Sequence, residues 1–226
     1  MSNKRKRTLR GFIDFLKKCR DQLESKKLKT KEKIGKSCSW HLDTKYLNKN
    51  SIIISGGAGN DISFELELIE KFNCKVYLFD PSPTGIKTVK NYNDIENLIF
   101  IPKALTGSSG SINFSPPDII EEGSYRVSRG DLNIETFEST TISDFCLENK
   151  ISEIDVLKID IEGFEYEVLE DVLENNKLRV SQILVEFHHF FKEIPKSKTK
   201  VIMNKLRRAG FKKTHRREVD YSYSIH

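Results

Sequence analysis

A glycine turn and a carboxylate stand at a spacing that suits an adenosine-containing cofactor. The turn Gly57-Ala58-Gly59 ends one apolar β-branched run, and Asp80 ends a second apolar run about 20 residues further on. Glycine lets the backbone approach a ligand where a side chain would collide. A carboxylate at this distance accepts hydrogen bonds from a ribose diol. Neither the glycine turn nor Asp80 is sufficient alone, but together they indicate an adenosine site.

The residues after the turn favour S-adenosylmethionine over a dinucleotide. A pyrophosphate-binding turn normally carries a third glycine, and Ile62 stands in its place. Asp61 would put a negative charge at the helix start, where a phosphate should bind. S-adenosylmethionine has no phosphate and carries a sulfonium and an ammonium, so an acidic neighbourhood suits it. A nicotinamide dehydrogenase is therefore disfavoured.

Hydrophobic periodicity predicts an α/β fold with a mostly parallel sheet and a terminal antiparallel hairpin. Short apolar runs alternate with helical patterns, and the segment 106–138, rich in Gly, Ser, Asn and Pro, predicts hairpins or a long loop. The expected strands cover 51–55, 74–79, 98–101, 154–161 and 180–187; the expected helices cover 61–72, 84–92, 142–149, 165–173 and 199–209; the final hairpin covers 211–225.

In a doubly wound sheet, ligands bind outside the carboxyl ends of the strands. All five predicted strands leave polar groups at that edge, as a cofactor site requires. These groups lie in the segments 55–61, 80–82, 103–105, 160–163 and 186–189.

S-adenosylmethionine is a methyl donor, and where its acceptor is a hydroxyl a nearby group must remove the hydroxyl proton. Several residues at this edge are candidates. His188 is favoured because its ordinary pKa is near neutrality, whereas His189 would point to the opposite face of the strand. The alternative for His188 is a structural, hydrogen-bonded histidine. Glu162 and Glu186 are the remaining candidates.

Asp160 ends a buried apolar strand, where a carboxylate is costly unless a positive group meets it. A helix cap is the alternative explanation. Asp160, Glu162 and Glu186 together could bind a divalent cation, but no spacing demands one, so the sequence predicts no metal. Tyr125, Arg126 and Arg129 are further candidates for acceptor contacts, with a solvated loop as the alternative.

The N-terminal segment is strongly basic. Residues 1–50 hold 16 Lys/Arg and 5 Asp/Glu, so the remainder of this +5 chain is acidic. We expect residues 1–45 to form a largely helical basic arm, with a helix over 8–28 and a lysine-rich linker or helix extension over 25–36, followed by one domain over 46–226. Through residues 1–36 the arm could serve solubility or attract a membrane surface or an acidic partner.

Other partner and compartment classes are limited by what the sequence lacks. The string Ser115-Pro116-Pro117-Asp118 is the nearest approach to the motif of base-methylating enzymes, so a nucleic-acid substrate is disfavoured. Four scattered cysteines suggest neither a zinc site nor disulfides. Neither a signal-peptide core nor an apolar run long enough to cross a bilayer is present. We expect a cytoplasmic protein, with peripheral membrane attachment as an alternative.

The motifs are similar to those of FkbM-type methyltransferases over residues 46–226. The run DVLKIDIEGFEYEVL at 155–169 is the most specific, and the others are SGGAGNDISFE (55–65), LFDPSP (78–83), KAL (103–105), TTISDF (140–145) and ILVEFHHF (183–190). The resemblance implies a class I, Rossmann-like fold, S-adenosylmethionine as cofactor, and O-methylation of a sugar, glycan or small metabolite.

The resemblance also implies roles for single residues. The turn would face the methionine part of the cofactor, the second strand end its ribose and adenosine, and the fourth the acceptor. The cofactor residues expected are Gly56, Gly57, Ala58, Gly59, Asp80, Pro81, Ser82, Lys103, Ala104 and Asp160. The resemblance implies Asp160 and Glu162 as catalytic residues, and His188 joins them on the argument from its pKa and strand end.

The sequence departs from the general class I pattern at Ser55, where an acidic residue commonly stands. Asp61 or Asp160 would have to replace that carboxylate. The departure is the main support for a rival interpretation, a non-catalytic binding protein with a methyltransferase fold that its basic arm tethers to a membrane or to nucleic acid.

Overall fold

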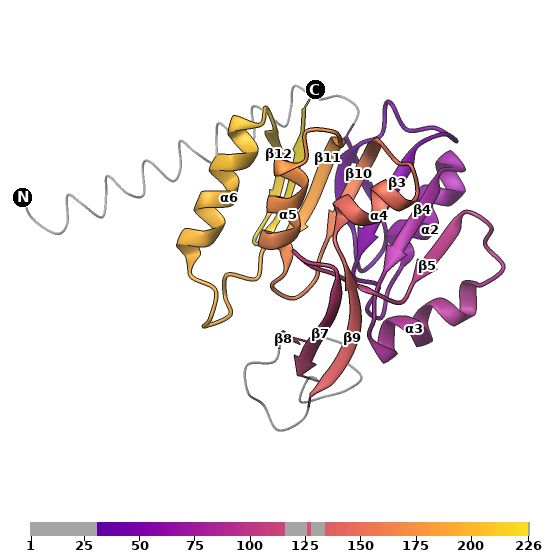
Figure 1. Ribbon diagram of the computed structural model, residues 1–226. Coiled ribbons are helices and arrows are strands. Elements are labelled where there is room, and N and C mark those ends of the chain that lie inside the picture. The colour runs from indigo at the N-terminus through magenta and orange to yellow at the C-terminus, as the bar shows by residue number, and fades with distance from the viewer. Residues whose placement is uncertain (1–30, 116–125, 128–133, 226) are drawn as a thin grey trace, which may run out of the picture.

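The computed structural model describes residues 31–115, 126–127 and 134–225. Its centre is a seven-stranded sheet with the order β12-β13-β11-β10-β3-β4-β5 (Figure 1). Five strands are parallel, and β13 is antiparallel to both β11 and β12. The strands are β3 (Ile52–Gly56), β4 (Lys75–Phe79), β5 (Leu98–Ile101), β10 (Glu153–Ile159), β11 (Arg179–Glu186), β12 (Lys212–Arg217) and β13 (Asp220–Ser224).

This topology confirms the predicted class I methyltransferase fold, a mostly parallel sheet with a terminal antiparallel hairpin. The central strands are apolar on both faces because helices cover both faces. Ile53 and Ile54 in β3 and Val156 and Leu157 in β10 are each fully buried. Such continuous apolar runs are what the sequence showed at these positions.

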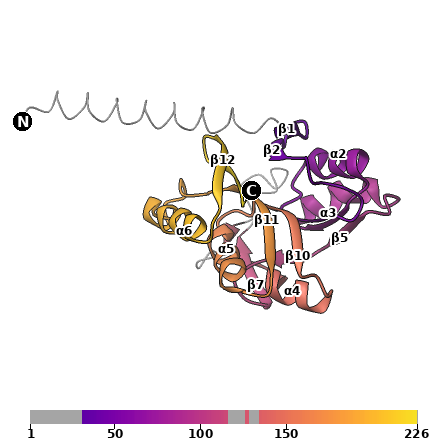
Figure 2. The same ribbon diagram turned by 90° about the horizontal axis from the view of Figure 1, so that it is seen from above.

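Helices cover the two faces of the sheet. Figure 2 shows α4, α5 and α6 on one face and α2 on the other, beside the β1–β2 hairpin. Ser82 caps α3 by accepting a hydrogen bond from the N–H of Gly85, and Thr141 caps α4 in the same way. No helix of the described residues is long and apolar enough to cross a membrane. The helices are α2 (Ser63–Phe72), α3 (Pro83–Val89), α4 (Ile142–Glu148), α5 (Glu165–Glu174) and α6 (Lys196–Arg208), with a 3-10 turn at Lys90–Tyr92.

A second, four-stranded sheet projects from the main body (Figure 1). Of the two alternatives for the segment 106–138, hairpins or a long loop, its described part forms antiparallel strand pairs. Tyr125 and Arg129, proposed above for acceptor contacts, lie outside the described residues, and Arg126 is described by its backbone alone. The strands are β6 (Ala104–Leu105), β7 (Gly110–Ser115), β8 (Arg126–Val127) and β9 (Glu135–Thr140).

The prediction for residues 31–45 needs correction. Instead of a linker or helix, the chain forms an antiparallel hairpin of β1 (Lys31–Ile34) and β2 (Trp40–Asp43). The hairpin packs against α2, and its side chains Ile34, Trp40 and Leu42 are buried with those of α2 and β3. The lysines of β1 obscured this pattern, because only one of its four residues is buried. We propose that the domain begins near residue 31; the predicted helix over 8–28 lies outside the described residues.

Candidate functional site

A cleft opens where the order of the strands reverses. Strand β3 lies between β4 and β10, so the chain leaves neighbouring carboxyl ends in opposite directions. The cleft there encloses about 260 Å³. It is lined by Cys38, Gly57, Ala58, Gly59, Asn60, Asp61, Phe79, Asp80, Pro81, Ser82, Ala104, Leu105, Phe114, Lys158, Asp160, Ile161, Glu162 and Phe164.

The glycine turn needs glycine for two different reasons. Gly57 has a φ of +90°, and a Cβ there would lie 2.0 Å from the backbone oxygen of Asp160. Gly57 thus allows the ends of β3 and β10 to approach each other. Gly59 has a φ of +49°, and a Cβ there would meet no atom within 4 Å. This side of the turn faces open space, as expected of a turn that lines a ligand cleft.

Asp80 is almost fully buried beside the turn and accepts three backbone hydrogen bonds. The N–H groups of Ala58 and Gly59 donate to Oδ2 at 2.8 and 3.0 Å, and that of Ser82 donates to Oδ1 at 2.8 Å. Gly85 leaves room for the carboxylate, because a Cβ there would lie 2.3 Å from its carbon. A carboxylate has about four acceptor positions, so Asp80 keeps acceptor capacity for a ribose hydroxyl.

The remaining cleft residues fit S-adenosylmethionine. Ala104, Leu105 and Phe114 supply apolar surface suited to an adenine ring. Asp160 and Asp61 supply negative charge suited to the sulfonium and ammonium. Asp61 is held in place by the N–H groups of Cys38 and Ser63, both at 2.8 Å.

Most cofactor residues expected from the sequence line this cleft, and two do not. Gly56 lies below it, where a Cβ would be 3.0 Å from the side chains of both Ile161 and Leu105. The ammonium of Lys103 pairs with Glu138 at 3.0 Å. The eight that line the cleft are Gly57, Ala58, Gly59, Asp80, Pro81, Ser82, Ala104 and Asp160.

Ser55 has a carboxylate partner that sequence reasoning missed. Its hydroxyl donates to Glu65 Oε1 at 2.5 Å, and Glu65 comes from α2 and is fully buried. Neither Asp61 nor Asp160 makes this contact. A carboxylate of the following helix thus contacts position 55, but it does not line the cleft.

Lys158 places a positive charge beside the glycine turn, and the sequence analysis did not identify it. Its side chain is buried in β10, and its ammonium donates to the carbonyl of Gly57 at 2.6 Å. Burial alone lowers the pKa of Lys158, but Cys38, Glu65 and other neighbouring acidic groups outweigh it and raise the pKa to about 12. A lysine inside the apolar run Val156-Leu157-Lys158-Ile159 was the signal that could have revealed it.

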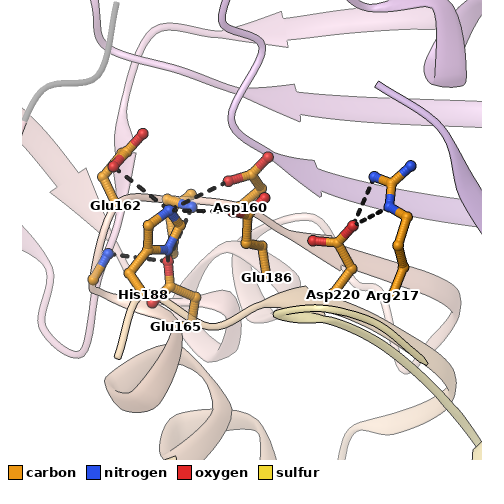
Figure 3. Close-up of polar contacts among 9 residues, drawn as sticks. Asp160, Glu162, Glu165, Glu186, His188, Arg217 and Asp220 are labelled. Carbon is orange, nitrogen blue, oxygen red and sulfur yellow. Dashed lines mark hydrogen bonds and ion pairs between the residues drawn. The ribbon is translucent and has the colours of Figure 1, made fainter. Parts of the chain in front are cut away.

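A histidine surrounded by carboxylates lies at the ends of β10 and β11 (Figure 3). His188 is 3% exposed, and its Nδ1 lies 2.7 Å from Oε1 of the buried Glu165. Its Nε2 faces the carboxylates of Glu162 at 3.5 Å, Asp160 at 3.8 Å and Glu186 at 4.0 Å. Asp160 and Glu162 also line the cofactor cleft, so the two sites are continuous.

The carboxylates change the protonation of the histidine. Burial alone lowers the pKa of His188, but the hydrogen bond to Glu165 and the surrounding negative charges outweigh it and raise the pKa to about 9. Burial, and then the charge of Asp160, raise the pKa of Glu186 to about 7. An imidazolium cannot accept a proton, which disfavours His188 as the base. Its role in catalysis stays a prediction.

The other candidates differ in their surroundings. Burial, with Lys196 and Arg216 nearby, lowers the pKa of His189. Asp160 does not cap α5, whose first turn has no side-chain cap. Glu162 has a φ of +54°, an uncommon conformation for a residue with a side chain, and such backbone is concentrated at functional sites.

Comparison with known proteins identifies a family. The model of the methyltransferase FkbM domain matches residues 46–213. The hexuronic acid methyltransferase AglP of Haloferax volcanii is 30% identical over 116 residues, which are 50% of this chain and 47% of that protein. The chain thus matches about half the length of this curated relative.

Solved structures give weaker likenesses. The methyltransferase FkbM of Methylobacillus flagellatus has a TM-score of 0.48 at 14% identity and covers 79% of this chain and 44% of that chain. The fibrillarin pre-rRNA processing protein of Methanococcus jannaschii has a TM-score of 0.45 at 15% identity, with 87% and 83% covered. Both TM-scores are below 0.5, so the assignment rests on the family match.

Proposed function

The chain belongs to the FkbM methyltransferase family, with S-adenosylmethionine as cofactor, and from that premise we propose that it methylates a hydroxyl oxygen of a sugar. The observation that carries the proposal is the acidic cluster around His188, which adjoins the cofactor cleft through Asp160 and Glu162. The carboxylates of this cluster can accept hydrogen bonds from a substrate that is rich in hydroxyl groups. The similarity to a hexuronic acid methyltransferase supports a sugar.

The proposed chemistry divides the work among the residues of the chain. S-adenosylmethionine supplies an electrophilic methyl group on a sulfonium. Asp80 and the glycine turn hold the ribose and the methionine part. Asp160 orients the acceptor hydroxyl toward the methyl carbon, as an in-line displacement requires. Glu162 takes the hydroxyl proton, because its carboxylate lines the cleft and is a quarter exposed.

The acceptor is tested with methyl-labelled S-adenosylmethionine and glycosides that end in a neutral hexose or in a hexuronic acid. We expect the label in a methyl ether on the sugar, identified by NMR. A base-labile methyl ester would overturn the hydroxyl acceptor, because the label would then be on a carboxyl group. Binding of S-adenosylhomocysteine without transfer to any glycoside would overturn the sugar acceptor.

The role of Glu162 is tested by Glu162→Gln. General-base catalysis contributes about 10²–10⁴-fold, so kcat should fall by that order while the Kd of S-adenosylhomocysteine stays the same. The matched control is Glu153→Gln, an exposed carboxylate at the start of β10, the strand that precedes Glu162. Unchanged kcat in Glu162→Gln would assign the proton to another group.

The rival function is that of a non-catalytic binding protein. Its main support is Ser55, which stands where an acidic residue is common in class I methyltransferases. Asp61 and Asp160 weaken that support, because both line the cleft and supply the negative charge that Ser55 lacks. Calorimetry separates the two functions. Absence of measurable affinity for S-adenosylmethionine and S-adenosylhomocysteine would favour the rival.

A further inference from the structure

Three side chains at the ends of β10 and β11 place metal-ligand atoms close together. Asp160, Glu186 and His188 each offer one such atom, and the three atoms lie within 4.8 Å of one another. Metal–ligand bonds of about 2.0–2.2 Å keep two ligand atoms of one ion within roughly 4.4 Å. The distances from His188 Nε2 to Asp160 Oδ1, 3.8 Å, and to Glu186 Oε1, 4.0 Å, already meet this limit.

His188 is oriented as a metal-binding histidine would be. Its Nδ1 is bound by Glu165, and Glu165 Oε1 is itself held by the N–H groups of Ile161 at 3.2 Å and Gly163 at 3.0 Å. Histidine ligands of metals almost always bond a carboxylate, carbonyl or water through the other ring nitrogen. Here that contact directs Nε2 of a 97% buried ring at the carboxylates.

Nε2 forms no hydrogen bond within the described residues, because its nearest carboxylate oxygens are 3.5 to 4.0 Å away. Nε2 therefore faces three carboxylates at distances that leave room for an ion to bind between them.

The charge of the cluster also favours a cation. The salt bridges of Asp160 and Glu186 among the described residues are to His188 alone. Asp220, beside Glu186, is neutralised by Arg217 at 2.7 Å (Figure 3). One imidazole therefore lies within 4.0 Å of the carboxylates of Asp160, Glu162, Glu165 and Glu186.

We propose that Asp160, Glu186 and His188 bind one divalent transition-metal ion, Mn²⁺ or Zn²⁺, beside the cofactor cleft. An imidazole among the ligands favours such an ion over Mg²⁺ or Ca²⁺, which prefer oxygen ligands alone. Three protein ligands leave coordination positions for the acceptor. The catalytic role rests on the proposed function: the ion would polarise the acceptor hydroxyl, whose proton passes to Glu162 as the methyl–oxygen bond forms and the methyl–sulfur bond breaks.

The test uses the full chain after dialysis against a chelator, titrated with Mn²⁺ and followed by electron paramagnetic resonance of the free ion. We expect one bound Mn²⁺ per chain. Zn²⁺ should displace it, whereas the same concentration of Mg²⁺ should not. Glu186→Gln should lower the affinity at least tenfold, because it removes an anionic ligand of nearly the same volume. Glu153→Gln, far from the cluster on β10, should bind as the parent does.

S-adenosylhomocysteine binding checks that each variant is folded, because Glu186 does not line the cofactor cleft. A parent protein that binds S-adenosylhomocysteine but neither Mn²⁺ nor Zn²⁺ would overturn the metal site, and His188 would then be an imidazolium that only balances the carboxylates. Parent-like Mn²⁺ affinity in Glu186→Gln would also overturn it. Stoichiometric Mn²⁺ binding without transfer to any sugar would instead overturn the proposed acceptor and leave the metal site intact.

Discussion

Asp80 holds the glycine turn as well as facing the cleft. Its three backbone hydrogen bonds tie Ala58, Gly59 and Ser82 to one carboxylate, which joins the ends of β3 and β4. A residue placed in this way prepares the site before a ligand binds. Its removal should therefore affect both stability and affinity.

We predict that Asp80→Ala weakens S-adenosylhomocysteine binding by about 1.5–3 kcal/mol, the contribution of a hydrogen bond to a charged group. The melting temperature should fall as well, because three N–H groups lose their acceptor. Calorimetry and thermal unfolding measure the two effects. Asp94→Ala, which removes an exposed carboxylate, is the control. Parent-like affinity in Asp80→Ala would exclude Asp80 from the ribose contact.

Lys158 and Glu65 depend on each other's charge. Burial raises the pKa of Glu65, and Lys158 is the main influence that lowers it. We predict that Lys158→Met destabilises the chain by about 3–5 kcal/mol, because it leaves a buried carboxylate without its cation. Adding Glu65→Gln should restore part of that loss, as measured by urea unfolding of both single variants and the double variant. Additive effects would contradict the coupling.

The hairpin of β1 and β2 is an element of the core. It buries Ile34, Trp40 and Leu42, and its loop brings Cys38 to the cofactor cleft. It thus joins the N-terminal side of the chain to the site. Its loss should affect both the fold and the cofactor.

We predict that a chain of residues 31–226 keeps the melting temperature and cofactor affinity of the full chain, whereas 46–226 unfolds on the order of 10 °C lower. Burying each large apolar side chain contributes about 1.5–3 kcal/mol, and 46–226 lacks three of them. Trp40 is the only tryptophan, so its fluorescence reports on the hairpin directly. An emission spectrum of a solvent-exposed indole in the folded full chain would contradict the packing.

Two histidines connect the hairpin to the C-terminal strands. The rings of His41 in β2 and His215 in β12 stack with centroids 3.8 Å apart. Burial lowers the pKa of His215 to about 4, with His41, Lys31 and Arg217 acting in the same direction. In the unfolded chain the pKa of histidine is about 6.5. The unfolded state therefore binds more protons between these values.

We predict that stability decreases as the pH falls from about 6.5 toward 4, because protonation of His215 favours the unfolded state. His215→Gln should reduce this decrease, since glutamine does not titrate. Melting temperatures of parent and variant at neutral and mildly acidic pH measure the difference. Equal changes in the two proteins would exclude His215 as a source of the pH dependence.

For the whole molecule, the separation of charge is the main feature. Residues 1–30 hold 11 Lys/Arg and 3 Asp/Glu, whereas the acidic groups of the site lie at the ends of β10 and β11. Positive charge of this density is attracted to anionic surfaces at low salt. This positive charge would not attract the N-terminal segment to an uncharged surface.

We predict that the full chain cosediments with vesicles containing phosphatidylserine and not with phosphatidylcholine vesicles. High salt should release it, because the attraction is screened. The chain 31–226 is the matched control and should stay in the supernatant. Equal sedimentation of both chains would exclude the N-terminal residues as the binding segment and leave solubility as their function.

The sequence by itself determined the alternating fold and the class of cofactor. Hydrophobic periodicity predicts strands and helices because it depends on residues close in the chain. The glycine turn and Asp80 predict an adenosine site because they end two successive strands of the sheet. The turn, Asp80 and the strand ends carrying Asp160 and His188 were all placed in this way. The hairpin over residues 31–43 was not, because its alternation is short and its first strand is mostly charged.

Only the tertiary structure decided how the charged groups meet. Glu65 under Ser55, Lys158 under the turn and Glu165 behind His188 are contacts between elements, which no local pattern specifies. The same holds for the protonation of His188. Its ordinary pKa suggested a base, but the carboxylates that the fold gathers around it raise that pKa and favour the imidazolium.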